Sequence, residues 1–228
     1  SPALLTGLDR TVCSTDVSGI TFGSQGTSVP ATTYNIISVT INPSLTQTAG
    51  NTGARTGVGQ NEVVNDRFQN PTNTVRTVVY RIEPVSAAGC RGPQVDVTLS
   101  VEPTVTMITP PNASICSDTP NTPSQTNILL NSNTVPSAGA ITFDYTAVAT
   151  PPGSVTGFFP AQANLPINFV ITDRLVNNTN AVATVTYTIT PKAVGAKGGV
   201  GCIAPTSTVV TITVDPKPRL SITPATQI

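Results

Sequence analysis

The sequence predicts an all-β chain made of two tandem antiparallel β-sandwich domains. Only 10% of its 228 residues are charged and 4% are aromatic, while 17 glycines and 21 prolines punctuate stretches rich in Thr, Val, Ser and Asn. Such a composition favours strands and turns over helices. Apolar residues alternate with period two, and no window of a dozen residues shows helical spacing. An internal repeat of domain length completes the prediction.

The repeat is clearest between residues 61–84 and 168–191, which align without a gap at 13 identities in 24 positions. Its period of about 105 residues is too long for solenoid repeats, which run ~20–50 residues, and therefore indicates tandem domains. We expect a first domain at 1–104, a second at 105–217, and the lead-in of a further repeat at 218–228.

Each unit ends in two strands whose alternating residues repeat from one copy to the other. Residues on one face of a strand point to the same side of the sheet, so the face that both copies keep apolar is expected to be core. The two tyrosines on this face are expected to pack inside, with each hydroxyl hydrogen-bonded near a strand corner. The predicted core residues are Val78, Tyr80, Ile82, Val97, Leu99 and Val101, with Val185, Tyr187, Ile189, Val210, Ile212 and Val214 in the second copy.

Four cysteines fall two per unit, one before the first core strand and one in the turn between the last two strands. In an immunoglobulin-like sandwich the N-terminus and that last turn share one end. Of the three connectivities that four cysteines allow, one keeps each bond within its unit. We therefore predict the disulfides Cys13–Cys90 and Cys116–Cys202, with four reduced, buried cysteines as the alternative. Paired cysteines in a Thr/Pro-rich chain favour an oxidising compartment.

Catalytic and metal-binding patterns are missing from the sequence. The chain has no histidine, its carboxylates are scattered, and no C-x2-C pair supplies zinc ligands. The glycine-rich stretches 53–59 and 195–201 do not fit G-x-x-x-x-G-K-[ST] and are interpreted as loops between strands. The sequence therefore predicts no enzyme, no cofactor and no metal site.

A shared Asp-Arg pair, Asp66-Arg67 and Asp173-Arg174, is the strongest candidate for a polar site. Alternation turns each aspartate toward the core, where a carboxylate needs partners. We interpret it as an acceptor for backbone N–H groups of the nearby "NPTN" or "NNTN" corner. A calcium ligand is the alternative, although calcium usually takes several carboxylates and the local supply is one.

The charge balance excludes some classes of partner. Net charge is zero and the pI is about 6.1, so neither nucleic acid nor an anionic membrane surface is expected to bind. No segment approaches the ~20 apolar residues that span a bilayer, so no membrane insertion is predicted.

The order of "ICS" (115–117), "VTYTITP" (185–191), "GC" (201–202) and "VTITVDPKP" (210–218) resembles the PKD-like, immunoglobulin-like repeats of very large cell-surface proteins in Bacteroidetes-type bacteria. These include gliding-motility adhesins exported by type IX secretion. The resemblance covers about 200 of the 228 residues. It implies two tandem immunoglobulin-like, PKD-like sandwiches without catalytic residues.

The function implied by this resemblance is that of a repeat module in a long, exported adhesin at the cell surface. It would act as a disulfide-stapled, protease-resistant stalk or spacer that extends adhesive regions from the cell and supports attachment or gliding. Its partners would be neighbouring repeats of the same chain, with polysaccharide or an abiotic surface as the further ligand.

Two alternatives remain open at this point. The chain could bind glycan or a surface through loops at one sandwich end, such as residues 51–60. Phe158 and Phe159, the only adjacent aromatic pair, are then candidate ligand contacts, and they equally suit a core plug or an interdomain contact. Exposed β edges could instead pair laterally between chains to form a surface fibre.

Overall fold

The computed structural model describes residues 1–197 and 201–218. These residues form strands, turns and loops without an α-helix, which confirms the all-β prediction. No helix in this part of the chain has the length and apolarity needed to cross a membrane. Packing divides the chain into two compact units. The first comprises Ser1–Thr106, Asn133–Ile141 and Lys192–Pro205, and the second comprises Met107–Ser132, Thr142–Pro191 and Thr206–Ile228.

The compact units do not follow the sequence repeats at every point. The first unit takes in residues 133–141 and 192–205 from the second repeat. The domain limits 1–104 and 105–217 stay a prediction. Within the expected lead-in at 218–228, residues 219–228 lie outside the described residues.

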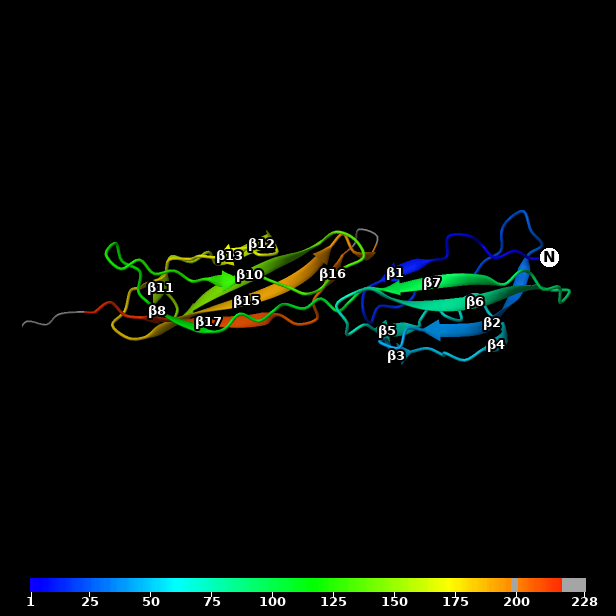
Figure 1. Ribbon diagram of the computed structural model, residues 1–228, viewed down its shortest axis with the longest axis horizontal. Coiled ribbons are helices and arrows are strands. Elements are labelled where there is room, and N and C mark those ends of the chain that lie inside the picture. The colour runs from blue at the N-terminus through cyan, green and yellow to red at the C-terminus, as the bar shows by residue number, and fades with distance from the viewer. Residues whose placement is uncertain (198–200, 219–228) are drawn as a thin grey trace, which may run out of the picture. The chain divides into compact units, whose positions relative to one another are not determined.

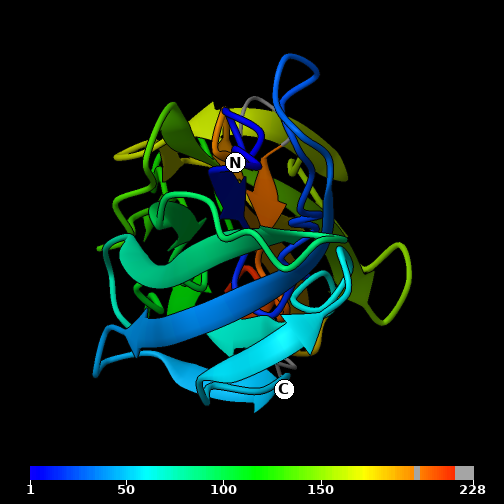
Figure 2. The same ribbon diagram turned by 90° about the vertical axis from the view of Figure 1, so that its right-hand side faces the viewer.

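The first unit is built on a five-stranded sheet in the order β1-β7-β6-β2-β4. In Figure 2 the blue strand β2 lies beside the teal strand β6 at the centre of this sheet. A two-stranded ribbon, β3–β5, belongs to the same unit (Figure 1). The strands are β1 (Arg10–Val12), β2 (Ala31–Ile41), β3 (Thr46–Ala49), β4 (Arg55–Val58), β5 (Arg67–Gln69), β6 (Arg76–Ser86) and β7 (Val95–Val101).

A six-stranded sheet is formed by residues of the second repeat, in the order β12-β10-β15-β17-β8, with β16 paired to β15. Two short ribbons, β11–β14 and β13–β9, accompany it. The strands are β8 (Ala113–Cys116), β9 (Ile128–Leu129), β10 (Ala140–Thr150), β11 (Val155–Thr156), β12 (Ala161–Pro166), β13 (Val170–Ile171), β14 (Val176–Asn177), β15 (Ala183–Val194), β16 (Cys202–Ile203) and β17 (Thr208–Asp215).

The alternating faces predicted as core are buried in both copies. All twelve residues named from the sequence are at most 2% exposed. Most of their neighbours on the opposite face of the strand are partly or fully exposed, as at Val79 and Arg81, whereas Glu83 is buried at 7% exposure. The polar and apolar periodicity of the last two strands therefore sets which face of each sheet is covered.

The layer that covers the five-stranded sheet consists largely of irregular chain. Backbone hydrogen bonds hold the segment after β1 against residues 60–66, with Ser18 N–H to Asp66 O at 2.8 Å and Phe22 N–H to Gln60 O at 2.9 Å. This pairing buries Phe22, whose ring lies 5.1 Å from that of Tyr34. Side chains carried by loops, such as Phe22, thus supply buried apolar groups to the core of this unit.

The first strand of each repeat runs parallel to the last one. β1 pairs with β7 in the register Val12↔Val101, and β8 pairs with β17 in the register Asp215↔Cys116. The pairs β2–β4, β2–β6 and β6–β7 of the first sheet, and β10–β12, β15–β16 and β15–β17 of the second, are antiparallel. The sequence predicted antiparallel pairing throughout. The parallel pairs were not foreseen because side chains alternate in the same way in parallel and antiparallel strands. In each repeat the parallel pair places the first cysteine at the C-terminal end of the last strand.

An asparagine closes the corner that precedes each long central strand. The Asn70 amide donates to Thr74 O and Val101 O, both at 2.9 Å, while its Oδ1 accepts from the N–H and hydroxyl of Thr72. Asn177 makes the equivalent four bonds in the second repeat. Both side chains are almost fully buried, so these bonds satisfy backbone groups that would otherwise be unpaired.

Candidate functional site

A buried carboxylate and a tyrosine hydroxyl form the main polar pair in each repeat. The Tyr80 hydroxyl donates to Asp66 Oδ2 at 2.9 Å, and the Tyr187 hydroxyl donates to Asp173 Oδ2 at 2.7 Å. Asp66 is 2% exposed and Asp173 is 6% exposed. The inward direction expected for the two aspartates is therefore confirmed.

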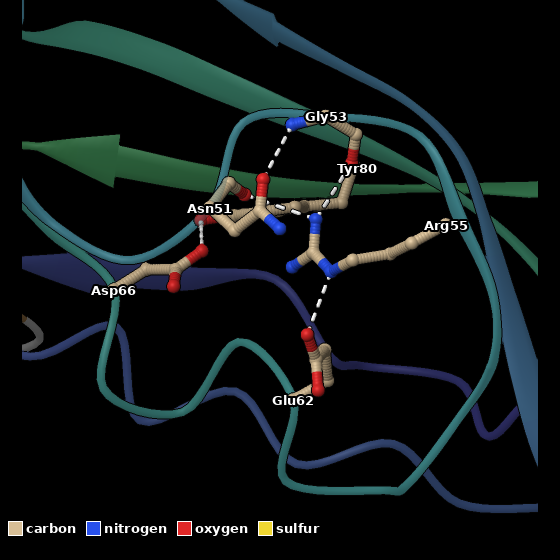
Figure 3. A network of polar contacts seen from close by, with 6 residues as sticks. All are labelled: Asn51, Gly53, Arg55, Glu62, Asp66 and Tyr80. Carbon is tan, nitrogen blue, oxygen red and sulfur yellow. Dashed lines mark hydrogen bonds and ion pairs between the residues drawn. The ribbon is translucent and has the colours of Figure 1, made fainter.

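The partners expected for these aspartates were wrong. Each carboxylate accepts a tyrosine hydroxyl and a backbone N–H from a distant loop, that of Asn51 for Asp66 and that of Phe159 for Asp173. Figure 3 shows the Asp66 carboxylate turned toward Asn51. The "NPTN" and "NNTN" corners are closed by their own asparagines instead. A usable signal was present in the sequence, because both repeats separate the aspartate and the tyrosine by 14 residues.

The environment of Asp66 disfavours its charged form. Burial raises the pKa of Asp66 to about 6, and the hydrogen bond from Tyr80 and the charge of Arg55 oppose this shift only in part. Burial also raises the pKa of Asp173 above its usual range, again against the hydrogen bond from Tyr187. Burial, together with the neighbouring carboxylate, raises the pKa of Tyr80 as well, so its hydroxyl keeps its proton and remains a donor.

Arg55 fixes the loop that reaches Asp66. Its Nε lies 2.7 Å from Glu62 Oε1, and its Nη1 donates to Asn51 O and Gly53 O at 3.0 and 2.7 Å. Asn51 Oδ1 in turn accepts from Gly53 N–H at 2.9 Å (Figure 3). Part of the 51–60 region that the sequence offered as a ligand-binding loop is thus pinned by its own polar groups.

Gly50 permits the close approach of this loop. Its φ of +107° lies in a region that side chains rarely adopt, and a Cβ at this position would come within 2.1 Å of Asp66 Oδ1. In the second repeat a Cβ at Gly157 would come within 2.0 Å of the backbone O of Arg174, the residue after Asp173. Each buried carboxylate therefore has a glycine in or beside the loop that meets it.

The arginine of each Asp-Arg pair faces outward and holds the segment after the first cysteine. Arg67 Nη1 donates to Thr15 O at 2.8 Å. Arg174 Nη2 lies 3.2 Å from Asp118 Oδ1, and Asp118 stands at the position equivalent to Thr15. The pair thus ties the interior of each repeat to its first strand, through the aspartate on one side and the arginine on the other.

Phe158 and Phe159 lie in the loop between β11 and β12. Phe158 is half-buried, whereas the Phe159 side chain is 59% exposed. The backbone N–H of Phe159 donates to Asp173, so the buried carboxylate anchors the backbone from which this ring projects. Their role as ligand contacts stays a prediction.

Possible metal ligands are dispersed over the part of the chain that the structure describes. Among residues 1–197 and 201–218, no three or more Asp, Glu, Cys or His side chains gather in a way that could hold an ion. Asp66 stands with one tyrosine and one backbone donor, and the nearby Glu62 is paired with Arg55. This arrangement can position chain segments and store a titratable proton.

The disulfide pairing predicted from the sequence is wrong. Cys13 is bonded to Cys202, with an S–S distance of 2.00 Å and a Cα–Cα distance of 5.7 Å across a sequence separation of 189. Cys90 and Cys116 are free and exposed. The bond lies within the first compact unit and joins residues from the two sequence repeats.

Strand direction explains this correction. Because β1 runs parallel to β7, Cys13 lies beyond Val101 at the C-terminal end of β7, whereas Cys90 lies before Val95 at its N-terminal end. Seven strand residues separate the two ends, which corresponds to roughly 20 Å. A disulfide needs Cα atoms within about 7 Å, so the two cysteines of one repeat cannot meet.

Glu102 holds the same segments that carry Cys202. Its fully buried carboxylate accepts hydrogen bonds from the N–H and hydroxyl of Ser137 and from the N–H of Lys197. The Lys197 ammonium lies 2.5 Å from Asp16 Oδ2. A groove of about 450 Å³ runs beside the disulfide, with Asp16 and Lys197 in its lining. Covalent and polar contacts therefore fix these residues together.

Comparison with known proteins identifies a family. The model of the PKD-like domain family matches residues 11–105 and 113–218, which is most of the chain. No curated protein matches the sequence.

Solved structures of low similarity include human protocadherin-24 EC1-2, with 16% identity, 95% of this chain and 99% of that chain covered, and a TM-score of 0.40. A point mutant of the CFA/I adhesin CfaE of enterotoxigenic E. coli has 9% identity, 96% and 87% coverage, and a TM-score of 0.33. The D00-D0 domain of intimin has 12% identity, 92% and 99% coverage, and a TM-score of 0.32. At these values the similarity carries no functional information.

Replacement of Tyr80 by Phe should destabilise the fold. The variant keeps the ring but leaves a buried carboxylate without its side-chain donor, which costs about 1–3 kcal/mol. Denaturant unfolding at pH 7 measures this loss, and Tyr187→Phe should show a loss of the same sign. Tyr34→Phe, a buried tyrosine outside both pairs, serves as the control. A Tyr80→Phe variant as stable as wild type would contradict the structural role of the pair.

The Asp66 carboxyl should make stability fall as pH rises. Its folded-state pKa of about 6 lies above the ordinary 3.8, so the native state binds the extra proton. The resulting stabilisation is fully present below about pH 4 and is lost as pH rises through 6, an effect of about 3 kcal/mol. The unfolding free energy of wild type should therefore decrease relative to that of Asp66→Asn as pH is raised from 4 to 7.5.

The matched control for this titration is Asp96→Asn. Asp96 is exposed, and its hydrogen bond from Arg81 lowers its pKa. The stability difference between wild type and this variant should be flat above pH 4. A flat difference for Asp66→Asn as well would show that Asp66 titrates normally.

Proposed function

Because the chain belongs to the PKD-like domain family, we propose that it is a non-catalytic stalk or spacer module of a long cell-surface adhesin. Its repeats extend adhesive regions from the cell and carry load between the cell and the surface to which it attaches. Neighbouring repeats of the same chain are its principal partners. An exported protein meets the oxidising surroundings in which a structural disulfide persists.

The observation that carries this proposal is the bond between Cys13 and Cys202. It closes a covalent loop over a sequence separation of 189, in a chain of 228 residues. Tension applied at the two ends passes from Cys13 directly to Cys202. The chain between them, which contains all of β2 to β15, is outside the path of the force.

This bypass limits how far the module can lengthen. An extended chain spans at most ~3.5 Å per residue, so the closed loop withholds about 660 Å of contour length. A spacer of this kind keeps its length under load even where individual sheets open. Such behaviour suits a stalk and is of no use to an isolated enzyme domain.

Force spectroscopy on the chain pulled from both termini tests this proposal. With the disulfide intact, extension should end before the loop is released. The double variant Cys13→Ser/Cys202→Ser should yield up to about 660 Å of further contour length. Wild type treated with a phosphine reductant should behave like the variant. Equal extension of the oxidised and reduced chains would refute a load-bearing role for the bond.

A second candidate function is direct contact with polysaccharide through the β11–β12 loop. The specific observation in its favour is the exposed Phe159 ring, whose backbone N–H is bound by the buried Asp173. Aromatic rings of this kind offer an apolar face to sugar rings.

Binding of the two-repeat chain to immobilised polysaccharides tests this second function. Phe159→Ala should abolish saturable binding while the melting temperature stays within a few degrees of wild type. Val148→Ala, which truncates another exposed apolar side chain, is the matched control. Unchanged binding in Phe159→Ala, or no binding by wild type across the panel, would rule out this loop as the contact.

A further inference from the structure

Two thiols are left over by the disulfide, and each has a bonded counterpart in the other repeat. Cys116 occupies the position of Cys13, and Cys90 occupies the position of Cys202. The bonded pair therefore joins the first cysteine of one repeat to the second cysteine of the repeat that follows. Cys116 is the first cysteine of the second repeat and Cys90 is the second cysteine of the first repeat. Both are unbonded and exposed.

The surroundings of Cys116 match those of Cys13. Each cysteine ends or follows a short strand that runs parallel to the last strand of its repeat. The serine after each one accepts a hydrogen bond from the corner asparagine, Ser14 from Asn70 N–H at 2.9 Å and Ser117 from Asn177 N–H at 3.0 Å. The backbone thus presents the two sulfurs in equivalent settings.

The surroundings of Cys90 correspond to those of Cys202 in position along the fold. Cys202 lies opposite Ala193 at the end of the long strand β15. Cys90 lies in the turn that follows the equivalent strand β6, where Ser86 N–H donates to Cys90 O at 3.0 Å and Cys90 N–H donates to Ser86 Oγ at 3.1 Å. Both cysteines sit just before the last strand of their repeat.

A second observation points to a partner at Cys116. Glu102, next to the end of β7, binds Ser137 and Lys197 of the segments that accompany Cys202. Its counterpart Asp215 pairs directly with Cys116 in the parallel register. The Asp215 carboxylate is half-buried and has no partner within residues 1–197 and 201–218. Asp215 and Cys116 therefore lie side by side, as Glu102 and Cys13 do in the first repeat. There, Glu102 and Cys13 bind residues of the second repeat.

We propose that Cys116 of one chain forms a disulfide with Cys90 of a second copy of this chain, and so links one repeat to another. Within an array the same bond links each repeat to the one after it. This inference rests on the proposed stalk function in one respect, namely that the natural partner is another repeat. Bond formation between two copies depends on the geometry alone.

The bond forms by thiol–disulfide exchange with a low-molecular-weight disulfide such as oxidised glutathione. The Cys116 thiolate attacks one sulfur of the glutathione disulfide, breaks its S–S bond and releases one glutathione thiolate. The Cys90 thiolate of the second chain then attacks the Cys116 sulfur of the mixed disulfide and releases the second glutathione. Two protein thiols lose two electrons and two protons, and one glutathione disulfide becomes two thiols.

The experiment pairs two single variants at equal concentration in a glutathione redox buffer. Cys90→Ser retains the Cys116 thiol, and Cys116→Ser retains the Cys90 thiol, so random exchange makes about one half of all dimers mixed. If the two chains dock before they react, the amount of mixed Cys116–Cys90 dimer should be roughly tenfold that of the Cys116–Cys116 and Cys90–Cys90 dimers. This is the ratio that one charge-assisted hydrogen bond supplies. Non-reducing electrophoresis and peptide mapping identify the products and verify that Cys13–Cys202 stays bonded.

Two charge variants separate docking from simple thiol exposure. Asp215→Asn in the chain that carries Cys116 should return the products toward random proportions, whereas Asp96→Asn in the same chain should not. The unmodified chain should give a ladder of covalent oligomers that collapses to monomer on reduction.

Random proportions, the absence of dimers, or a Cys90–Cys116 bond within one chain would each overturn the proposal. The stalk function would be unaffected by any of these results, since its test uses the Cys13–Cys202 bond. Oligomers that persist under reducing conditions would support the lateral assembly alternative and overturn the disulfide-linked array.

Discussion

The parallel pairing of the first and last strand is the constraint on which the arrangement of each repeat depends. It fixes the direction of β1 against β7 and of β8 against β17, and so carries the first cysteine to the far end of the sheet from the second. Each repeat thereby has unlike groups at its two ends, a cysteine beside an acidic residue at one and a cysteine before the last strand at the other, and one cysteine of each repeat remains a free thiol. Because the two ends differ, each repeat has a direction. A contact between the unlike ends of successive copies is heterologous and extends an array instead of forming a closed dimer.

The buried aspartate–tyrosine pairs connect this framework to the loops. Each aspartate receives one hydrogen bond from the central strand and one from the loop that begins near Gly50 or Gly157. The next residue, an arginine, reaches outward to the segment after the first cysteine. Two adjacent side chains thus bind three separate parts of the chain. Few aromatic residues are available to form a large core, and directed polar bonds compensate by fixing where the irregular segments lie.

Local patterns predicted the parts of the structure that depend on local geometry. Alternation identified the buried faces of the last two strands, and the shared Asp-Arg pair identified the inward carboxylates. The partner of Asp66 was missed because Tyr80 lies 14 residues away, although the same spacing in both repeats marked the relation. The disulfide was missed for a different reason. Side-chain alternation is identical in parallel and antiparallel strands, so nothing in residues 10–13 reveals that β1 runs with β7 and moves Cys13 away from Cys90.

The separation of Cys13 from its partner imposes an order on biosynthesis. Cys90 lies much nearer to Cys13 along the chain than Cys202 does, so in an unfolded chain Cys13 meets Cys90 more readily than it meets Cys202. An early oxidant would join Cys13 to Cys90 and trap the chain in the wrong pairing. Docking of β1 beside β7 removes that hazard, because it holds the two sulfurs at opposite ends of one strand. The native bond therefore depends on a first repeat that folds faster than it is oxidised, and redox timing is part of the information that specifies this structure.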